Sequence, residues 1–356
     1  MRQQTCRRGL WVLALTATAL AASARAAKPP DKGVRLDDAA FRPGEEVRID
    51  DDAIGGLGYY LIYVPTDYTP QKQWPIALCY HGVDGNPTTW PFKQATGGKG
   101  LVIVGMEYAK RGLEGYDSIG KDVATVKRLL PILVKRLSAD NRQMFIGGFS
   151  KGGFMVSAIG GRTPTLWTGM LIMGAGRHGT TGTRGFSGKA VYVGVGETDG
   201  NRSSAEKAAA AYRQAGARVT LEIYKGKGHA VDAKSEMMRD FFLANTVYRE
   251  VEPLVAQAEA LAKRQRVGQA YAAYRKAAAV SETFGPCLKA AEAADALAKR
   301  FEEGAAEAER LTDQGQYPRA ATILRRLARE FAGCDLAEKA KRLIPELAER
   351  ARQQGN

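Results

Sequence analysis

The chain has 356 residues, with 52 Lys or Arg against 38 Asp or Glu, and a formal charge of +14 at pH 7. This length is typical of about two domains. The positive charge could favour anionic partners, but it is scattered and accompanies no nucleic-acid-binding motif, so nucleic-acid binding is not expected. The sequence shows no metal-ligand spacing of Cys and His and no phosphate-cradling loop, so neither a metal nor an organic cofactor is expected.

Residues 1–26 have the pattern of a secretory signal peptide. A basic start that includes Arg7 and Arg8 precedes an apolar stretch from Leu10 to Ala22, and small residues follow up to Ala26. The apolar run is too short for a membrane span. We therefore expect an exported, periplasmic or secreted protein that is not transmembrane.

Between residues 27 and 249, short apolar runs alternate with helical segments. Helices are expected at Asp117–Leu137 and Ser203–Ala215. The expected strands are Tyr59–Val64, Ile76–Tyr80, Leu101–Val104, Gln143–Gly147, Met170–Met173, Val191–Val195 and Val219–Ile223. This alternation predicts an α/β fold, with a mostly parallel sheet covered by helices on both faces.

The most informative stretch is Gly148-Phe149-Ser150-Lys151-Gly152, which lies between an expected strand and an expected helix. A serine on a tight strand-to-helix turn flanked by glycines is typical of a nucleophile elbow. The glycines are required because the turn is strained and neighbouring Cβ atoms would clash. Such a turn exposes the Ser150 hydroxyl and brings the N–H of Lys151 near a developing oxyanion.

A serine nucleophile needs a base, and the chain has three histidines. His229 follows the last expected strand and comes latest in the chain. His81 lies in a much earlier loop, and His178 precedes the candidate acids. We therefore predict that His229 is the base for Ser150.

Two carboxylates that follow the strand Val191–Val195 could orient His229. Asp199 is preferred to Glu197 because it lies further into the loop and is followed by Gly200. Serine, acid and histidine then each come just after the carboxyl end of a strand.

In this order of landmarks, residues 58–245 resemble the α/β-hydrolase superfamily, particularly its compact esterase branch of dienelactone-hydrolase-like and polyester-depolymerase-like enzymes. The resemblance implies an α/β-hydrolase fold and a Ser150–His229–Asp199 triad that cleaves carboxylic esters through an acyl-enzyme. It places an oxyanion-hole loop at His81-Gly82-Val83, with the N–H of Val83 as second donor beside that of Lys151. Only 16 residues separate Met173 from Ala190, where the family inserts a lid. The expected site is open, which suits small esters or polymer ends.

Four side chains near these landmarks have two readings each. Trp90 and Phe149 are either walls of the substrate pocket or core residues. His81 lines the substrate pocket or, as we prefer, pins its loop. For Lys151 we favour a solvated side chain, the alternative being attraction of a substrate carboxylate.

Residues 250–356 form an alanine-rich, charged helical region. Two segments match at an offset of 47, for example Gly268 with Gly315 and Cys287 with Cys334. This pattern resembles a pair of tetratricopeptide-like helical hairpins, although the period is longer than usual. Equivalent positions in stacked hairpins are too far apart for a disulfide, so Cys287 and Cys334 are expected to be buried and unpaired.

Two other functions compete with a serine esterase. A serine peptidase of the prolyl-oligopeptidase type shares the fold and the triad order. Alternatively, the protein is non-catalytic and binds a protein or the cell envelope through residues 250–356.

Overall fold

The computed structural model describes residues 32–179, 182–282 and 284–354. The predicted signal peptide, 1–26, lies outside this range. Within these residues, no helix combines the length and the apolar character needed to cross a membrane.

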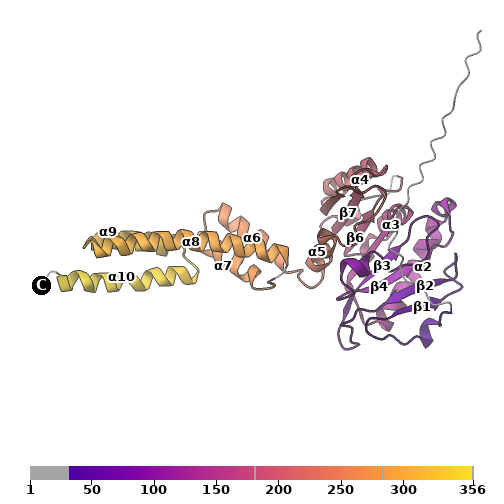
Figure 1. The fold of residues 1–356 in the computed structure, drawn as a ribbon, viewed down its shortest axis with the longest axis horizontal. Helices are drawn as coiled ribbons and strands as arrows, with labels where there is room; N and C mark the ends of the chain where they lie inside the picture. The colour runs from indigo at the N-terminus through magenta and orange to yellow at the C-terminus, as the bar shows by residue number, and fades with distance from the viewer. Residues whose placement is uncertain (1–31, 180–181, 283, 355–356) are drawn as a thin grey trace, which may run out of the picture.

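An eight-stranded sheet forms the centre of the N-terminal part (Figure 1). Its order is β1-β2-β4-β3-β5-β6-β7-β8. β1 and β2 run antiparallel to their neighbours, and all pairs from β4 to β8 are parallel. The strands are β1 (Glu46–Asp50), β2 (Tyr59–Tyr63), β3 (Trp74–Tyr80), β4 (Val102–Met106), β5 (Ala139–Phe149), β6 (Gly169–Met173), β7 (Ala190–Gly196) and β8 (Arg218–Tyr224).

Successive residues of a strand point to opposite faces of the sheet, and in the central strands both sets of residues are apolar. Helices therefore cover both faces. Leu78 of β3 points to a core shared with α2 (Ile119–Arg136), α3 (Lys151–Arg162) and α4 (Arg202–Gln214). The next residue, Cys79, points to a second core. That core is closed by α1 (Phe92–Ala95) and α5 (Glu236–Asn245). The described residues of this part also form four 3-10 turns: η1 (Leu36–Asp38), η2 (Leu113–Ser118), η3 (Pro164–Leu166) and η4 (Arg184–Phe186).

This architecture is the α/β-hydrolase fold that the sequence predicts. All seven expected strands are present, with bounds that differ by a few residues. β1 was not expected: its sequence, Glu-Val-Arg-Ile-Asp, alternates charged and apolar residues because it is an edge strand with one solvent-facing side.

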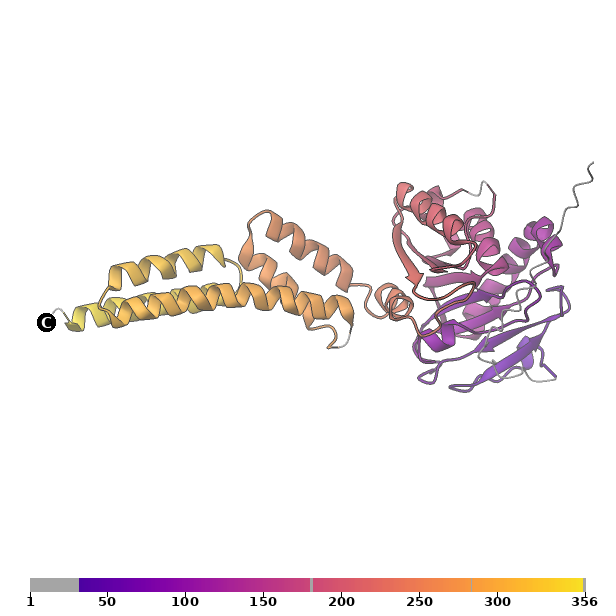
Figure 2. The same ribbon diagram turned by 45° about the horizontal axis from the view of Figure 1, so that its top comes forward.

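Beyond α5, the part of the C-terminal region that the structure describes folds into five helices (Figure 2). They are α6 (Val251–Lys263), α7 (Val267–Ala278), α8 (Gly285–Asp313), α9 (Tyr317–Glu330) and α10 (Asp335–Gln354). The 29-residue α8 packs against α7 near its start and against α9 near its end. The region is therefore not two separate hairpins, because one continuous helix belongs to both units.

The structural repeat has an offset of 50 rather than 47. The α6–α7 turn places Gln265 at φ 59°, and the α8–α9 turn places Gly315 at φ 72°. Val251 and Phe301 are likewise both fully buried. Gly268, which the sequence matched to Gly315, instead lies inside α7. The offset of 47 is therefore wrong, and kinship with tetratricopeptide repeats stays a prediction.

At the corrected offset, the two cysteines no longer occupy equivalent positions of the repeat. Both thiols are free, as predicted. Cys287 is buried inside α8, and its counterpart at an offset of 50 is the buried Ala337 of α10. Cys334 instead precedes α10 and is only half-buried, with its Sγ 3.2 Å from the Phe331 carbonyl oxygen. The prediction that Cys334 is buried is therefore wrong, because its side chain is partly exposed.

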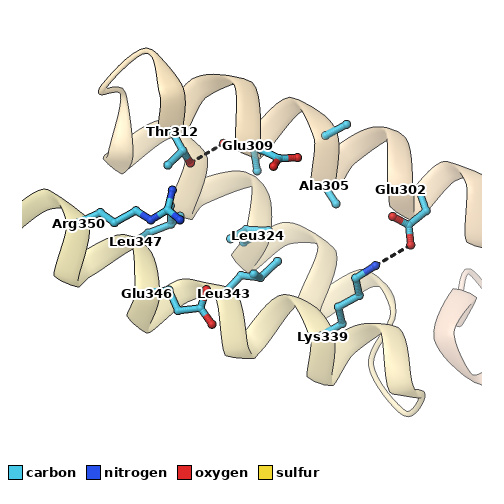
Figure 3. A pocket seen from close by; sticks show the side chains of 12 residues that line it. Glu302, Ala305, Glu309, Thr312, Leu324, Lys339, Leu343, Glu346, Leu347 and Arg350 are labelled. Atoms are coloured by element: carbon cyan, nitrogen blue, oxygen red, sulfur yellow. Dashed lines mark hydrogen bonds and ion pairs between the residues drawn. The ribbon is translucent and has the colours of Figure 1, made fainter.

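A groove of about 280 Å3 lies between α8, α9 and α10 (Figure 3). Leu324, Leu343 and Leu347 supply its apolar lining. Lys339 and Glu302 form an ion pair across one end, with 2.9 Å between Nζ and Oε1. The groove is thus apolar with a charged rim.

Candidate active site

Ser150 occupies a strained turn between β5 and α3. Its φ of 56° and ψ of −119° are rare for a residue with a side chain. A Cβ on Gly148 would come within 2.6 Å of the Gly152 backbone, and one on Gly152 within 2.3 Å of the Tyr80 carbonyl oxygen. Both glycines are therefore sterically required, as the sequence predicts. The Ser150 N–H donates to the Met173 carbonyl at 2.8 Å, which ties the turn to β6.

Three side chains from distant parts of the chain meet at this turn. The Oγ of Ser150 lies 2.8 Å from Nε2 of His229. The other ring nitrogen of His229, Nδ1, lies 2.9 Å from Oδ2 of Asp199. Since a carboxylate only accepts, Nδ1 carries the hydrogen and Nε2 is free to accept from the serine hydroxyl. The predicted serine, histidine and aspartate thus form one continuous hydrogen-bonded chain.

The loop after β7 separates the two candidate acids. Asp199 is buried, and its second oxygen, Oδ1, accepts from the Asn201 N–H at 2.8 Å. Glu197 is exposed and accepts from the Gly226 N–H at 2.9 Å. Asp199 therefore contacts the histidine, whereas Glu197 ties its own loop to the loop that carries His229.

Aromatic rings flank His229. The Phe149 ring lies 4.9 Å from the imidazole, and Trp90 packs edge-to-face on Phe149 at 6.2 Å. Both aromatic residues are half-buried. Phe149 therefore lies beside the histidine with Trp90 next to it, and both residues also pack against the second core.

Two backbone N–H groups are candidate oxyanion donors. Lys151 is the first residue of α3, so its N–H has no acceptor within the helix, and the helix dipole adds positive potential there. Val83 lies in the loop after β3, next to Gly82. A Cβ on Gly82 would lie 3.7 Å from the Cβ of Ser150, so this loop runs alongside the serine.

The favoured reading of Lys151 as a solvated side chain is wrong, because the residue is 2% exposed. Its Nζ lies 3.8 Å from the centre of the Tyr108 ring and 3.4 Å from the Lys110 carbonyl oxygen. Burial lowers the pKa of Lys151, against the opposing charges of Asp122 and Glu107. The ring of Tyr108 substitutes for part of the lost hydration.

His81 is buried and pinned, as preferred from the sequence. Its ring nitrogens contact Gly82 O and the Glu107 carboxylate. Sequence reasoning missed Glu107 and its partner Arg111, because nothing but a position after β4 distinguishes them. His178 stacks on Tyr116, with ring centroids 4.7 Å apart, rather than joining the triad.

Among the described residues, no group of three or more His, Cys, Asp or Glu side chains is arranged to hold a metal ion.

Comparison with known proteins gives no match among family models or curated proteins. Among solved structures, the chain is similar to a thermostable esterase from Pseudomonas putida, at 17% identity and a TM-score of 0.46, covering 60% of this chain and 84% of that one. The chain is also similar to a Bacillus cereus carboxylesterase, at 16% identity and a TM-score of 0.44. This match covers 52% of the present chain and 93% of the carboxylesterase.

A candidate dipeptidyl aminopeptidase IV from Bacteroides ovatus gives 15% identity and a TM-score of 0.45. This match covers 56% of the present chain and only 35% of that protein. At these identities and TM-scores, the similar structures do not indicate which activity this chain has. The fold rests on the strand order given above.

Proposed function

We propose that the protein is a serine hydrolase that cleaves carboxylic esters. The observation that carries this proposal is the hydrogen-bonded chain from Ser150 through His229 to Asp199, with contacts of 2.8 Å and 2.9 Å. A serine hydroxyl becomes nucleophilic when a base accepts its proton, and the base needs a third group to hold its tautomer.

In the proposed reaction, Ser150 Oγ attacks the ester carbonyl while His229 Nε2 takes its proton. Asp199 stabilises the resulting imidazolium, and the N–H groups of Lys151 and Val83 stabilise the tetrahedral oxyanion. His229 then protonates the departing alkoxide. Water, deprotonated by the same histidine, then attacks the acyl carbon. The bond to Ser150 Oγ breaks, His229 returns the proton to Oγ, and the carboxylic acid is released.

Exposure of the site favours accessible substrates. The His229 side chain is 44% exposed. An open site with Trp90 and Phe149 at its side suits small esters or the ends of a polymer. The proposed location, periplasmic or extracellular, rests on the sequence of residues 1–26 alone.

The helical region takes no part in this chemistry. Its described helices contribute no residue to the triad, which comes from the turn after β5 and the loops after β7 and β8. We propose that residues 250–356 bind a protein or envelope partner, for which the groove beside α10 is one accessible place.

A panel of substrates tests the proposal. p-Nitrophenyl esters of increasing acyl length should be hydrolysed by the wild type, and Ser150→Ala should abolish that activity. Dipeptidyl and prolyl p-nitroanilides should be cleaved far more slowly. Faster cleavage of the anilides would instead favour a peptidase, and no cleavage of either class would favour a binding protein.

A further inference from the structure

The loop that carries Val83 is tied down at both ends to one buried carboxylate, that of Glu107. His81 Nε2 lies 3.1 Å from Glu107 Oε1, and Arg111 donates to Oε2 at 2.7 Å. Each of these partners also holds a loop carbonyl. His81 Nδ1 lies 2.7 Å from Gly82 O, and the second guanidinium nitrogen of Arg111 donates to Gly85 O at 2.6 Å.

The turn itself is compact. The Gly85 N–H donates to the Gly82 carbonyl at 3.2 Å, which closes the turn around Val83 and Asp84. A Cβ on Gly85 would lie 3.0 Å from Nδ1 of His81, so a side chain there would press on the ring. The hydroxyl of Tyr108 donates to the His81 carbonyl and so also holds the backbone of His81 in place.

The hydrogen-bond partners of His81 indicate that both of its ring nitrogens donate. A carbonyl oxygen can only accept, so Nδ1 must donate to Gly82. Glu107 accepts from three donors, the third being the Tyr108 N–H at 2.8 Å. Burial acts to raise the pKa of Glu107, but the hydrogen bonds from His81 and Tyr108 and the charge of Arg111 outweigh it and hold the pKa below its usual value. An ionised Glu107 can only accept, so Nε2 must donate as well.

We infer that His81 is an imidazolium ion, held between Gly82 and Glu107, and that it is a positioning residue for the oxyanion donor Val83. This inference rests on the proposed function, because it assigns the purpose of the loop. Loss of either ring proton would break one of the two ties and release one end of the turn. A backbone donor that moves by a fraction of an ångström loses much of its stabilisation of the transition state.

The charges around His81 are consistent with a cation there. Glu107 faces it from the end of β4, Arg111 lies beyond that carboxylate, and the Tyr108 ring packs edge-on to the imidazole at 4.6 Å. Lys151 of α3 contacts the same Tyr108 ring, and Asp84 lies on the loop itself.

Nuclear magnetic resonance of the full chain labelled with 15N-histidine tests the protonation state directly. With three histidines in the sequence, the His81 signals can be assigned by their loss in His81→Gln. Near neutral pH we expect two protonated ring nitrogens for His81, and one unprotonated nitrogen in Glu107→Gln. A neutral His81 in the wild type would overturn the inference.

Positioning is tested separately. In Glu107→Gln, kcat for an ester should fall about tenfold to a hundredfold while KM stays within about twofold, since one oxyanion donor is typically worth 100- to 1,000-fold. Amide hydrogens of residues 82–85 should exchange faster. Glu206→Gln, an exposed carboxylate on α4 paired with Arg202, is the matched control and should change neither.

Arg111→Lys provides a second variant should Glu107→Gln fold poorly, because Arg111 is partly exposed. It should speed the same amide exchange and lower kcat by less. Unchanged kcat and unchanged exchange in a folded variant would overturn the positioning role. If the wild type hydrolyses no ester, the proposed function fails on its own, while histidine protonation and loop exchange still decide this inference.

Discussion

Gly196 lies directly against the carbonyl group of Gly228: a Cβ on Gly196 would come within 1.9 Å of that oxygen. The contact joins the loop of Asp199 to the loop of His229. Two further bonds strengthen it, from the Thr198 N–H to the Lys227 carbonyl at 3.0 Å and from the Gly226 N–H to Glu197 at 2.9 Å. Asp199 and His229 are therefore positioned as one unit.

Gly196→Ala should disrupt this unit. The new methyl group cannot fit, so the His229 loop must move away, and a displacement of about 1 Å can cost roughly 100-fold in rate. We expect kcat for a p-nitrophenyl ester to fall by about that factor while the fold persists by circular dichroism. Gly200→Ala is the control, because a Cβ there meets nothing within 4 Å. Equal activity of both variants would contradict the coupling of the two loops.

The two acids should respond very differently to amide substitution. Asp199→Asn presents a donor to His229 or forces the wrong tautomer, and we expect kcat to fall about 10,000-fold. Glu197→Gln keeps an oxygen that can accept from Gly226, so its loss should stay below about tenfold. Steady-state kinetics of both variants checks this, and the reverse order would reassign the acid.

Asp122 should make stability depend on pH. Burial raises its pKa to about 6, against a hydrogen bond from Ala109 and the charge of Lys151. Its folded pKa exceeds the unfolded value of about 3.9, so the folded state binds the proton more tightly. Stability from this group is then complete below pH ~4 and lost as the pH rises through ~6.

Asp122→Asn removes this dependence. Between pH 4 and pH 7, the unfolding free energy of the variant relative to wild type should rise by about 2–3 kcal/mol. Urea denaturation at several pH values measures the difference. A constant difference across this range would mean that Asp122 titrates normally in the folded protein.

Substitution of Phe301 tests whether the packing of the helical region affects ester hydrolysis. It is fully buried in the middle of α8, and its ring meets Phe331 edge-on at 5.3 Å. Phe301→Ala should lower the stability of residues 250–356 by about 3–5 kcal/mol through lost burial and a cavity. Leu288→Ala, at a position 46% exposed, should have little effect. Ester hydrolysis should persist in both, and its loss would show that the helices support the site.

Much of the fold follows from the sequence because buried parallel strands are short apolar runs. Seven strands and the turn at Ser150 could be predicted in this way, and so could the meeting of Ser150, Asp199 and His229. β1 was missed because an edge strand alternates charged and apolar residues.

The remaining differences come from contacts between distant residues. Lys151 was expected in solvent because a charge is costly to bury, and nothing in its neighbourhood reveals that Tyr108 will cover it. Gly268 and Gly315 match in the sequence, but glycine is required at the two positions for different reasons. Gly315 adopts a positive φ in a turn, whereas a Cβ on Gly268 would lie 2.1 Å from the Phe331 carbonyl oxygen.

Labelling of the purified protein with a fluorophosphonate, read by intact mass and peptide mapping, tests the central claim most directly. An activated serine reacts with this probe, whereas an ordinary hydroxyl does not. We predict one adduct, on Ser150, with none in Ser150→Ala and strongly slowed labelling in His229→Ala. A folded wild type that acquires no adduct, or acquires it at another serine, would contradict the assignment of Ser150 as the nucleophile.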